Sequence, residues 1–331
     1  MPRSGEYSEV EPRQRDEPGE SGVLSKARFV VRALLTGATG LLGKALLAKL
    51  ENAVVLSRDP DRARNEFAAS GGSIPDVYGW DPASGPPPAE ALRDVDVIFN
   101  LAGEPVGERW TAEKKRRIYD SRVLGTRHLV SALTAPPARR PVLISASAVG
   151  YYGDRGDDEL DESAPSGRDF LAGVCADWER EAMAAHGAGL RVVCARIGLV
   201  LAAKGGALGR MIGPFKMGAG GRLGDGKQWW PWIHIDDAVG ILLHASRNDA
   251  VFGAVNAVSP NPVTNAEFTR ALGKAIRRPT ICAMPKMALR IALGEFSDAL
   301  LSSQRAFPAA AKRSGYAFEY ENLPDALASL V

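Results

Sequence analysis

The chain has 331 residues, 45% of them hydrophobic and 24% charged, so it is long enough to bury a large core. This composition excludes collagen-like, coiled-coil and wholly disordered proteins. Lysine and arginine total 41 against 39 aspartate and glutamate, a formal net charge of +2. Such a balance favours neither nucleic acid nor a membrane as the main partner, although it does not exclude a local patch.

The cysteines and the first residues bear on the cellular compartment of the protein. Cys175, Cys194 and Cys282 are widely spaced and odd in number, which predicts neither a disulfide framework nor a metal site. Residues 1–27 are rich in charge and lack the apolar core of a secretory signal. We interpret them as a flexible leader. A run of about 18 apolar residues, as a membrane-spanning helix needs, is absent from the sequence, and we expect a cytoplasmic protein.

From residue 29 onward, short apolar runs rich in β-formers alternate with segments of helical spacing. The runs predict strands at 29–35, 53–56, 95–99, 141–144 and 191–195, and the spacing predicts helices at 41–50, 111–133 and 174–186. Strands without polar alternation, separated by helices, are typical of a parallel sheet covered on both faces. The sequence therefore predicts an α/β fold with a doubly wound parallel sheet.

A glycine-rich turn joins the first predicted strand to the first predicted helix. Gly37, Gly40 and Gly43 have the spacing GxxGxxG, with Thr39, Leu41 and Leu42 between them. One glycine permits the tight turn, the next lets a pyrophosphate approach the backbone, and the third lets the helix pack on the sheet. The turn therefore predicts dinucleotide binding. The alternative is a turn that serves backbone geometry alone.

The residues after the second and third strands bear on which dinucleotide binds. Folds that select NAD place an acid at the end of the second strand, whereas this chain has Ser57 and Arg58. Arg58, assisted by Arg62, can pair with a 2′-phosphate, which favours NADP over NAD. The alternative is that these arginines are solvated surface charges. Asp81 is expected near the adenine, or else serves as a turn-forming acid.

The residues after the strand predicted at 95–99 complete the expected cofactor site. Leu101, Ala102 and Gly103 follow the strand predicted at 95–99. Their small size or apolar character lets a cofactor lie close to the backbone there.

The sequence pattern of the chain changes after about residue 200. We interpret 28–200 as the dinucleotide-binding domain, with contributions from about 232–250, and 201–331 as a smaller α/β lobe on the substrate side. The lobe ends in a C-terminal domain at about 255–331, which is interrupted by prolines. We interpret the glycine-rich residues 204–228 as a loop. Because open α/β folds bind ligands at the C-terminal edge of the sheet, we expect the lobe to pack there.

Several segments resemble extended short-chain dehydrogenase/reductases of the sugar-nucleotide epimerase/dehydratase type: Gly37–Gly43, Asn100–Gly103, Arg122–Thr126, Ser145–Gly153 and Trp232–Asp237. Three more resemble an atypical subgroup of NAD(P)-dependent epimerase-family proteins, sometimes labelled cell-division inhibitors, with a C-terminal domain of unknown function: Arg196–Leu201, Gly220–Gln228 and Asn256–Asn265. The resemblance runs from about residue 29 to the end. It implies a Rossmann-like fold, a bound nicotinamide dinucleotide and a cleft between two lobes.

The resemblance also implies a catalytic pattern, which this chain matches only in part. Family chemistry uses a Tyr-x-x-x-Lys pair on a helix, in which the lysine lowers the pKa of the tyrosine for proton exchange. When Glu179 is aligned with the acid that follows this pair, Leu171 and Cys175 occupy the two catalytic positions. Arg122 replaces the family's upstream asparagine. Ser147 matches the serine that holds the substrate oxygen.

Other residues are candidates for the missing chemistry. Tyr151 and Tyr152 are candidate proton donors, and His234 is a candidate base. Structural roles, as wedges in the loop or as a local hydrogen-bonding group, are the alternative for all three. Gln228 and Trp232 are candidate substrate contacts through hydrogen bonding and stacking, although core packing explains the tryptophan as well.

Two functional hypotheses follow from these residues. The first is an NADP-dependent oxidoreductase or epimerase that acts on a small carbonyl, alcohol or sugar-like substrate. The second is a regulator or interaction protein that binds NADP(H) without catalysis, which the missing pair supports. The sequence favours the enzyme with a small-molecule partner, and it predicts neither the substrate nor the oligomeric state.

Overall fold

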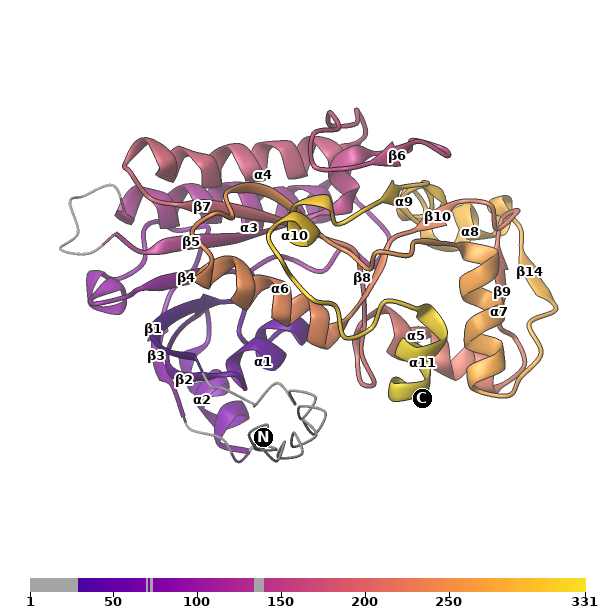
Figure 1. Ribbon diagram of the computed structural model, residues 1–331, viewed down its shortest axis with the longest axis horizontal. Helices are drawn as coiled ribbons and strands as arrows, with labels where there is room; N and C mark the ends of the chain where they lie inside the picture. Colours follow the sequence, from indigo (N-terminus) through magenta and orange to yellow (C-terminus); the bar gives the residue numbers. More distant parts are fainter. Residues whose placement is uncertain (1–28, 70, 72–73, 134–139) are drawn as a thin grey trace, which may run out of the picture.

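The computed structural model describes residues 29–69, 71, 74–133 and 140–331, so the expected leader at 1–27 lies outside the described residues. Its centre is a seven-stranded sheet with the order β12-β7-β5-β4-β1-β2-β3 (Figure 1). Every neighbouring pair in this sheet is parallel. The strands are β1 (Phe29–Thr36), β2 (Leu50–Ser57), β3 (Asp76–Gly79), β4 (Val97–Asn100), β5 (Val142–Ala148), β7 (Val192–Ile197) and β12 (Gly253–Ala257). The predicted doubly wound, Rossmann-like α/β fold is confirmed.

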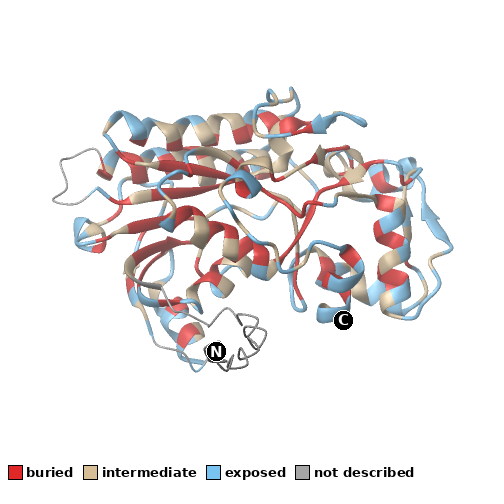
Figure 2. Ribbon diagram, viewed as in Figure 1, coloured by how far each residue is buried: buried red, intermediate tan, exposed pale blue. Residues whose placement is uncertain are grey.

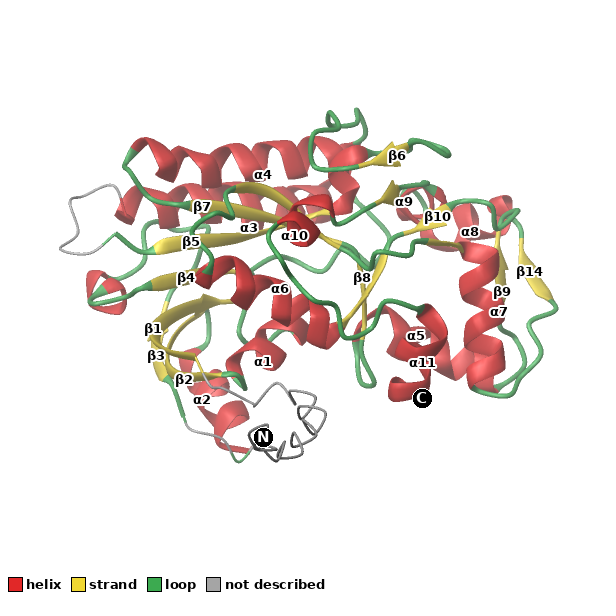
Figure 3. Ribbon diagram, viewed as in Figure 1, coloured by secondary structure: helices red, strands yellow, loops and turns green. Residues whose placement is uncertain are grey.

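Helices cover both faces of the sheet (Figures 1 and 3). One face carries α1 (Leu41–Leu47), α2 (Pro60–Ala69), α6 (Ile235–Arg247) and α10 (Ala309–Arg313), and the other carries η1 (Ala89–Leu92), α3 (Ala112–Leu133) and α4 (Phe170–Gly187). Successive side chains of a strand point to opposite faces, so Leu34 joins one apolar cluster and Leu35 the other. Figure 2 shows the resulting concentration of buried residues on the sheet.

A smaller lobe extends from the carboxyl edge of the sheet. It comprises β8 (Leu199–Leu201), α5 (Gly206–Lys216), β9 (Gly221–Leu223), β10 (Trp229–Trp230), β11 (Trp232–His234), β13 (Val263–Thr264), α7 (Asn265–Ala275), β14 (Cys282–Met284), α8 (Lys286–Leu293), α9 (Phe296–Leu301) and α11 (Leu323–Leu330). Beside it lie η2 (Val149–Tyr152), β6 (Glu159–Leu160) and β15 (Arg305–Ala306). Trp230, Trp232 and Phe268 are buried together in the core of this lobe.

The glycine-rich residues 204–228 differ from the expected loop, because they contain α5 and β9. Glycine disfavours a helix in isolation, by about 1 kcal/mol relative to alanine. Tertiary packing outweighs that cost here, since Leu208 and Phe215 of α5 are buried in the core of the lobe. The pattern of glycines concealed this amphipathic spacing.

The helices in the described part of the chain include none that is long and apolar enough to cross a membrane. The same residues contain no group of three or more His, Cys, Asp or Glu side chains that could hold a metal ion.

The C-terminal segment returns to the sheet through a buried carboxylate at the start of α6. Asp237 is buried, and it accepts hydrogen bonds from the Tyr316 hydroxyl (3.0 Å) and from the amides of Glu319 (2.9 Å) and Tyr320 (2.9 Å). Tyr316 and Phe318 also pack against the cluster that includes α6. Asp237 therefore fixes residues 316–320 against α6 and the central sheet.

Replacing Asp237 tests this attachment. We expect Asp237→Ala to lower the free energy of unfolding by about 3 kcal/mol, because it leaves buried amide and hydroxyl donors without an acceptor. Urea unfolding measures the change. Asp249→Ala is the matched control, because this exposed acid forms only a surface ion pair with Arg191 and should cost less than about 1 kcal/mol. Equal losses for the two variants would refute the anchoring role.

Candidate functional site

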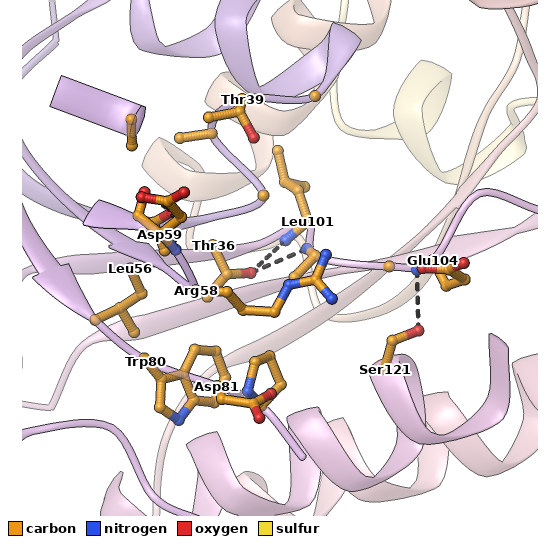
Figure 4. A pocket seen from close by; sticks show the side chains of 18 of the residues that line it. Thr36, Thr39, Leu56, Arg58, Asp59, Trp80, Asp81, Leu101, Glu104 and Ser121 are labelled. Carbon is orange, nitrogen blue, oxygen red and sulfur yellow. Dashed lines mark hydrogen bonds between the residues drawn. The ribbon is translucent and has the colours of Figure 1, made fainter. Parts of the chain in front are cut away.

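A cleft of about 840 Å³ lies at the carboxyl edge of the sheet, where β1, β2, β3 and β4 end (Figure 4). Ten of the thirteen residues predicted to bind a cofactor line it: Gly37, Thr39, Gly40, Ser57, Arg58, Arg62, Asp81, Leu101, Ala102 and Gly103. Leu41, Leu42 and Gly43 belong to the first turn of α1 and are not among the lining residues. The strand order therefore brings together residues that the sequence separates by up to 66 positions.

The glycine turn forms one wall of the cleft through unusually close backbone contacts. Gly37 has a φ of +70°, and a Cβ there would lie 2.7 Å from the Leu101 carbonyl oxygen. A Cβ on Gly43 would lie 2.2 Å from the Gly37 carbonyl oxygen. Only glycine fits at these two positions, since side chains would clash with backbone atoms. The turn thus presents bare backbone to the cleft.

A buried hydrogen-bond network fixes the two central strand ends. The Thr36 hydroxyl donates to Asn100 Oδ1 (2.9 Å) and accepts from the amides of Leu101 and Ala102 (3.0 Å each). Asn100 Nδ2 in turn donates to the Thr126 hydroxyl of α3 (2.8 Å). The roles of Thr36 and Thr126 are not predictable from the sequence, because their contacts with Asn100 depend on strand register and on the packing of α3 rather than on any local motif.

Glu104 is held to α3 through all of its polar groups. Its amide donates to the Ser121 hydroxyl (2.9 Å), and its carbonyl accepts from Arg122 Nη1 (3.0 Å). Its carboxylate accepts from Lys114 Nζ at 2.8 Å, which lowers the pKa of Glu104 and raises the pKa of Lys114. Lys114 is buried and also contacts Glu108 (3.0 Å). These contacts set the position of the loop after β4, and no sequence motif predicts them.

Arg58 lies across the middle of the cleft, facing the carboxyl ends of several strands (Figure 4). Its charge helps to lower the pKa of Asp81, after the larger effects of hydrogen bonds from the Ser84 hydroxyl and the Ala83 amide. It has the same minor effect on Glu104. Among the described residues no carboxylate forms an ion pair with Arg58. Arg62, Arg116 and Arg117 also line the cleft, where acidic side chains match the basic ones in number.

Ser147 lies at the end of β5, beyond the lining of the cleft. Its hydroxyl donates to Glu179 Oε1 (2.6 Å). Arg196 holds the same carboxylate with two hydrogen bonds, from Nε (2.9 Å) and Nη2 (2.8 Å). Cys175 is buried beside Ser147, and burial raises the pKa of its thiol to about 12. The position expected for a catalytic lysine therefore holds a neutral thiol at pH 7.

The two adjacent tyrosines have different surroundings. Tyr152 is fully buried, and its hydroxyl accepts from Arg196 Nη1 (3.0 Å) and lies 2.6 Å from Asn256 Oδ1, to which it donates. Burial raises the pKa of Tyr152 to about 12. Tyr151 is half-buried, and its ring stacks against the Arg196 guanidinium at 3.5 Å. Of the pair, Tyr151 is the one with an exposed portion.

The candidate substrate residues Gln228, Trp232 and His234 are buried in the smaller lobe. The Gln228 amide donates to the Leu223 carbonyl (3.1 Å), and the Trp232 indole donates to the Asn261 carbonyl (3.0 Å). His234 caps α6 by accepting from the Asp236 amide, and its ring stacks on Tyr320 with centroids 3.8 Å apart. Burial lowers the pKa of His234. None of the three lines the cleft at the strand ends.

Comparison with known proteins identifies the family. The model of the NAD dependent epimerase/dehydratase family matches residues 33–257. The chain belongs to this family. A domain of unknown function, DUF1731, matches residues 284–330. This agrees with the resemblance to epimerase-family proteins that carry such a C-terminal domain.

Individual relatives of the epimerase/dehydratase family match almost the whole chain. An epimerase family protein of Mycobacterium leprae is 40% identical, over 88% of this chain and 93% of its own. A chloroplastic SDR39U1 homolog of Arabidopsis thaliana is 39% identical, over 90% and 86%. The crystal structure of human epimerase family protein SDR39U1 with NADPH has a TM-score of 0.78 at 32% identity, covering 91% of this chain and 99% of that one.

The two tyrosines can be separated experimentally. Tyr152→Phe should lower the free energy of unfolding by about 1–3 kcal/mol, because it removes an acceptor of Arg196 Nη1 and leaves the buried Asn256 Oδ1 without its donor. Tyr151→Phe, the matched control, should change it by less than about 0.5 kcal/mol, because the stacked ring is retained. Thermal or urea unfolding gives both values. A neutral Tyr152→Phe would argue against its structural role.

Proposed function

We propose that the cleft binds NADP(H) and that the protein is an NADP(H)-dependent oxidoreductase or epimerase of its family. The observation that best supports this proposal is a cleft that spans the ends of β1, β2 and β4. Its backbone turn has no room for a Cβ at Gly37. Such a turn fits a pyrophosphate, which needs close backbone approach. The NADPH in the human relative's crystal structure supports the same ligand.

The strand order β2-β1-β4-β5 gives the direction in which a dinucleotide would lie. Ser57, Arg58 and Asp81 would hold the adenosine half, with Arg58 on the 2′-phosphate. The turn at Gly37 would hold the pyrophosphate. The nicotinamide half would then lie toward Gly103 at the end of β4 and toward Ser147 at the end of β5.

The bound cofactor would supply hydride acceptance or donation. The chain's own contribution would differ from the family pattern, because Leu171 and Cys175 stand where the Tyr-x-x-x-Lys pair is expected. Ser147 would position the reacting oxygen of a small carbonyl, alcohol or sugar-like substrate once its buried hydroxyl turns from Glu179, to which it donates in this structure. Tyr151, which retains an exposed portion, would be the better-placed proton donor, whereas Tyr152 is committed to buried hydrogen bonds.

The second candidate is a regulator or interaction protein that binds NADP(H) without turnover. The observation that favours it is the neutral Cys175 thiol at the expected lysine position, because no ammonium is then available to lower a tyrosine pKa. Both candidates use the same cleft, and they differ only in whether Ser147 meets a reacting substrate.

Coenzyme affinity tests the proposed site. Isothermal titration of nucleotide-free protein should show NADPH binding more tightly than NADH by about ten- to a hundred-fold, because Arg58 pairs with the 2′-phosphate. Arg58→Glu should erase this preference, since it repels the phosphate. Arg93→Glu, a reversal at an exposed arginine outside the cleft lining, is the control and should retain it. Equal wild-type affinities would refute the NADP assignment.

Turnover separates the two candidates. A screen of small carbonyls, alcohols and sugar nucleotides, followed by NADPH absorbance at neutral pH, should find a substrate whose turnover falls about a hundred-fold in Ser147→Ala. NADPH affinity in this variant should be unchanged, which shows that the site remains intact. Tight coenzyme binding without turnover of any compound would favour the regulator instead.

A further inference from the structure

Arg122 lies on α3 against the end of β4, next to a residue that lines the cleft. A Cβ on Gly103 would be 2.9 Å from the guanidinium carbon of Arg122. Nη1 donates to the carbonyls of Glu104 (3.0 Å) and Ile118 (3.2 Å), and the guanidinium is 5.3 Å from the Trp178 ring centroid. These contacts hold the cation in one place, beside the position proposed for the nicotinamide half.

Arg122 forms no ion pair in the described part of the chain, although the charge of Glu104 acts on it. The Glu104 carboxylate is held by Lys114 Nζ at 2.8 Å, and the Glu179 carboxylate by Arg196. Cys175, whose charge would interact with Arg122, is a neutral thiol at pH 7. Asp120 projects about 200° away around the helix, since each residue turns it by about 100°. Burial lowers the pKa of Arg122, although guanidinium groups stay protonated in proteins.

The remaining donors of Arg122 are available to a ligand. Only Nη1 forms hydrogen bonds within the described residues, and neither Nε nor Nη2 is a fully buried atom without a partner. These two nitrogens form an edge of the guanidinium that matches a carboxylate in a bidentate geometry. A partly buried, unpaired cation is costly, and an anion that bound to it would offset that cost.

We propose that Arg122 is the anion-binding residue of the substrate site, and that the substrates carry a carboxylate near the reacting carbon. This inference rests on the proposed function, because it places the nicotinamide beside Gly103. It also predicts how the site discriminates between the two redox states of the coenzyme. The oxidised nicotinamide ring is positively charged, whereas the reduced ring is neutral. Arg122 therefore disfavours NADP⁺ relative to NADPH until a carboxylate balances its charge.

Coenzyme binding without turnover tests the proposal. NADPH should bind wild-type protein more tightly than NADP⁺ by on the order of ten-fold, from the repulsion of two nearby unit charges. Arg122→Gln should reduce this ratio to near one, and Arg122→Lys should keep most of it. Arg127→Gln is the control, because Arg127 lies on the same helix but pairs with Glu181 at an exposed site. Fluorescence or calorimetric titration gives each dissociation constant.

Acetate serves as the probe for the anion site. At constant ionic strength, replacing chloride by acetate should tighten NADP⁺ binding to wild-type and Arg127→Gln protein several-fold, and leave Arg122→Gln unchanged. If Arg122→Gln does not fold, Arg122→Lys decides the matter, because the loss of bidentate geometry should make its acetate effect weaker than that of wild-type protein, and an equal effect would overturn the inference.

An unchanged NADPH to NADP⁺ ratio in Arg122→Gln, or an equal acetate effect in every variant, would overturn the inference while the proposed function stands. Failure of both coenzymes to bind wild-type protein would overturn the proposed function, and this inference with it.

Discussion

The contact on which the site depends is the one between the ends of β1 and β4. Thr36 and Asn100 lie side by side in the parallel register, and both are buried. The Thr36 hydroxyl satisfies the amides of Leu101 and Ala102, so the chain after β4 turns toward Gly37. Because Gly37 lacks a Cβ, the Leu101 carbonyl can approach it closely. The shape of the cleft thus follows from one hydroxyl and one missing side chain.

Two carboxylates, the buried Asp237 and the half-buried Glu162, fasten the C-terminal segment to this frame. Asp237 accepts from the backbone of residues 319 and 320, and Glu162 accepts from the amides of Asn256 and Ala310. A carboxylate that accepts backbone N–H groups substitutes for the missing sheet or helix partners of an irregular segment. Residues 316–320 therefore stay in place on the sheet without regular structure of their own.

The sequence predicted those parts of the site that depend on local pattern. Strand ends, Gly37 and Arg58 follow from short motifs, and parallel strands bring such ends to one edge. Lys114, Glu104 and Thr36 were missed because their partners are distant in sequence and are chosen by packing. Residues 204–228 contain a helix and a strand instead of the predicted loop for the same reason. The burial of their apolar side chains outweighs the low helix propensity of the glycines. The adjacent Tyr151 and Tyr152 differ only through what surrounds each ring.

The position of positive charge distinguishes this chain from the pattern that its family resemblance implies. That pattern places a lysine on α4 next to a tyrosine, whereas here α4 carries Cys175 and Leu171. A cation is nevertheless present, because Arg122 reaches the same region from α3. With Leu171 in place of the tyrosine, this cation has no phenol on α4 to tune. Its charge interacts with Cys175 and Glu104, and we propose that it also acts on the ligand bound beside Gly103.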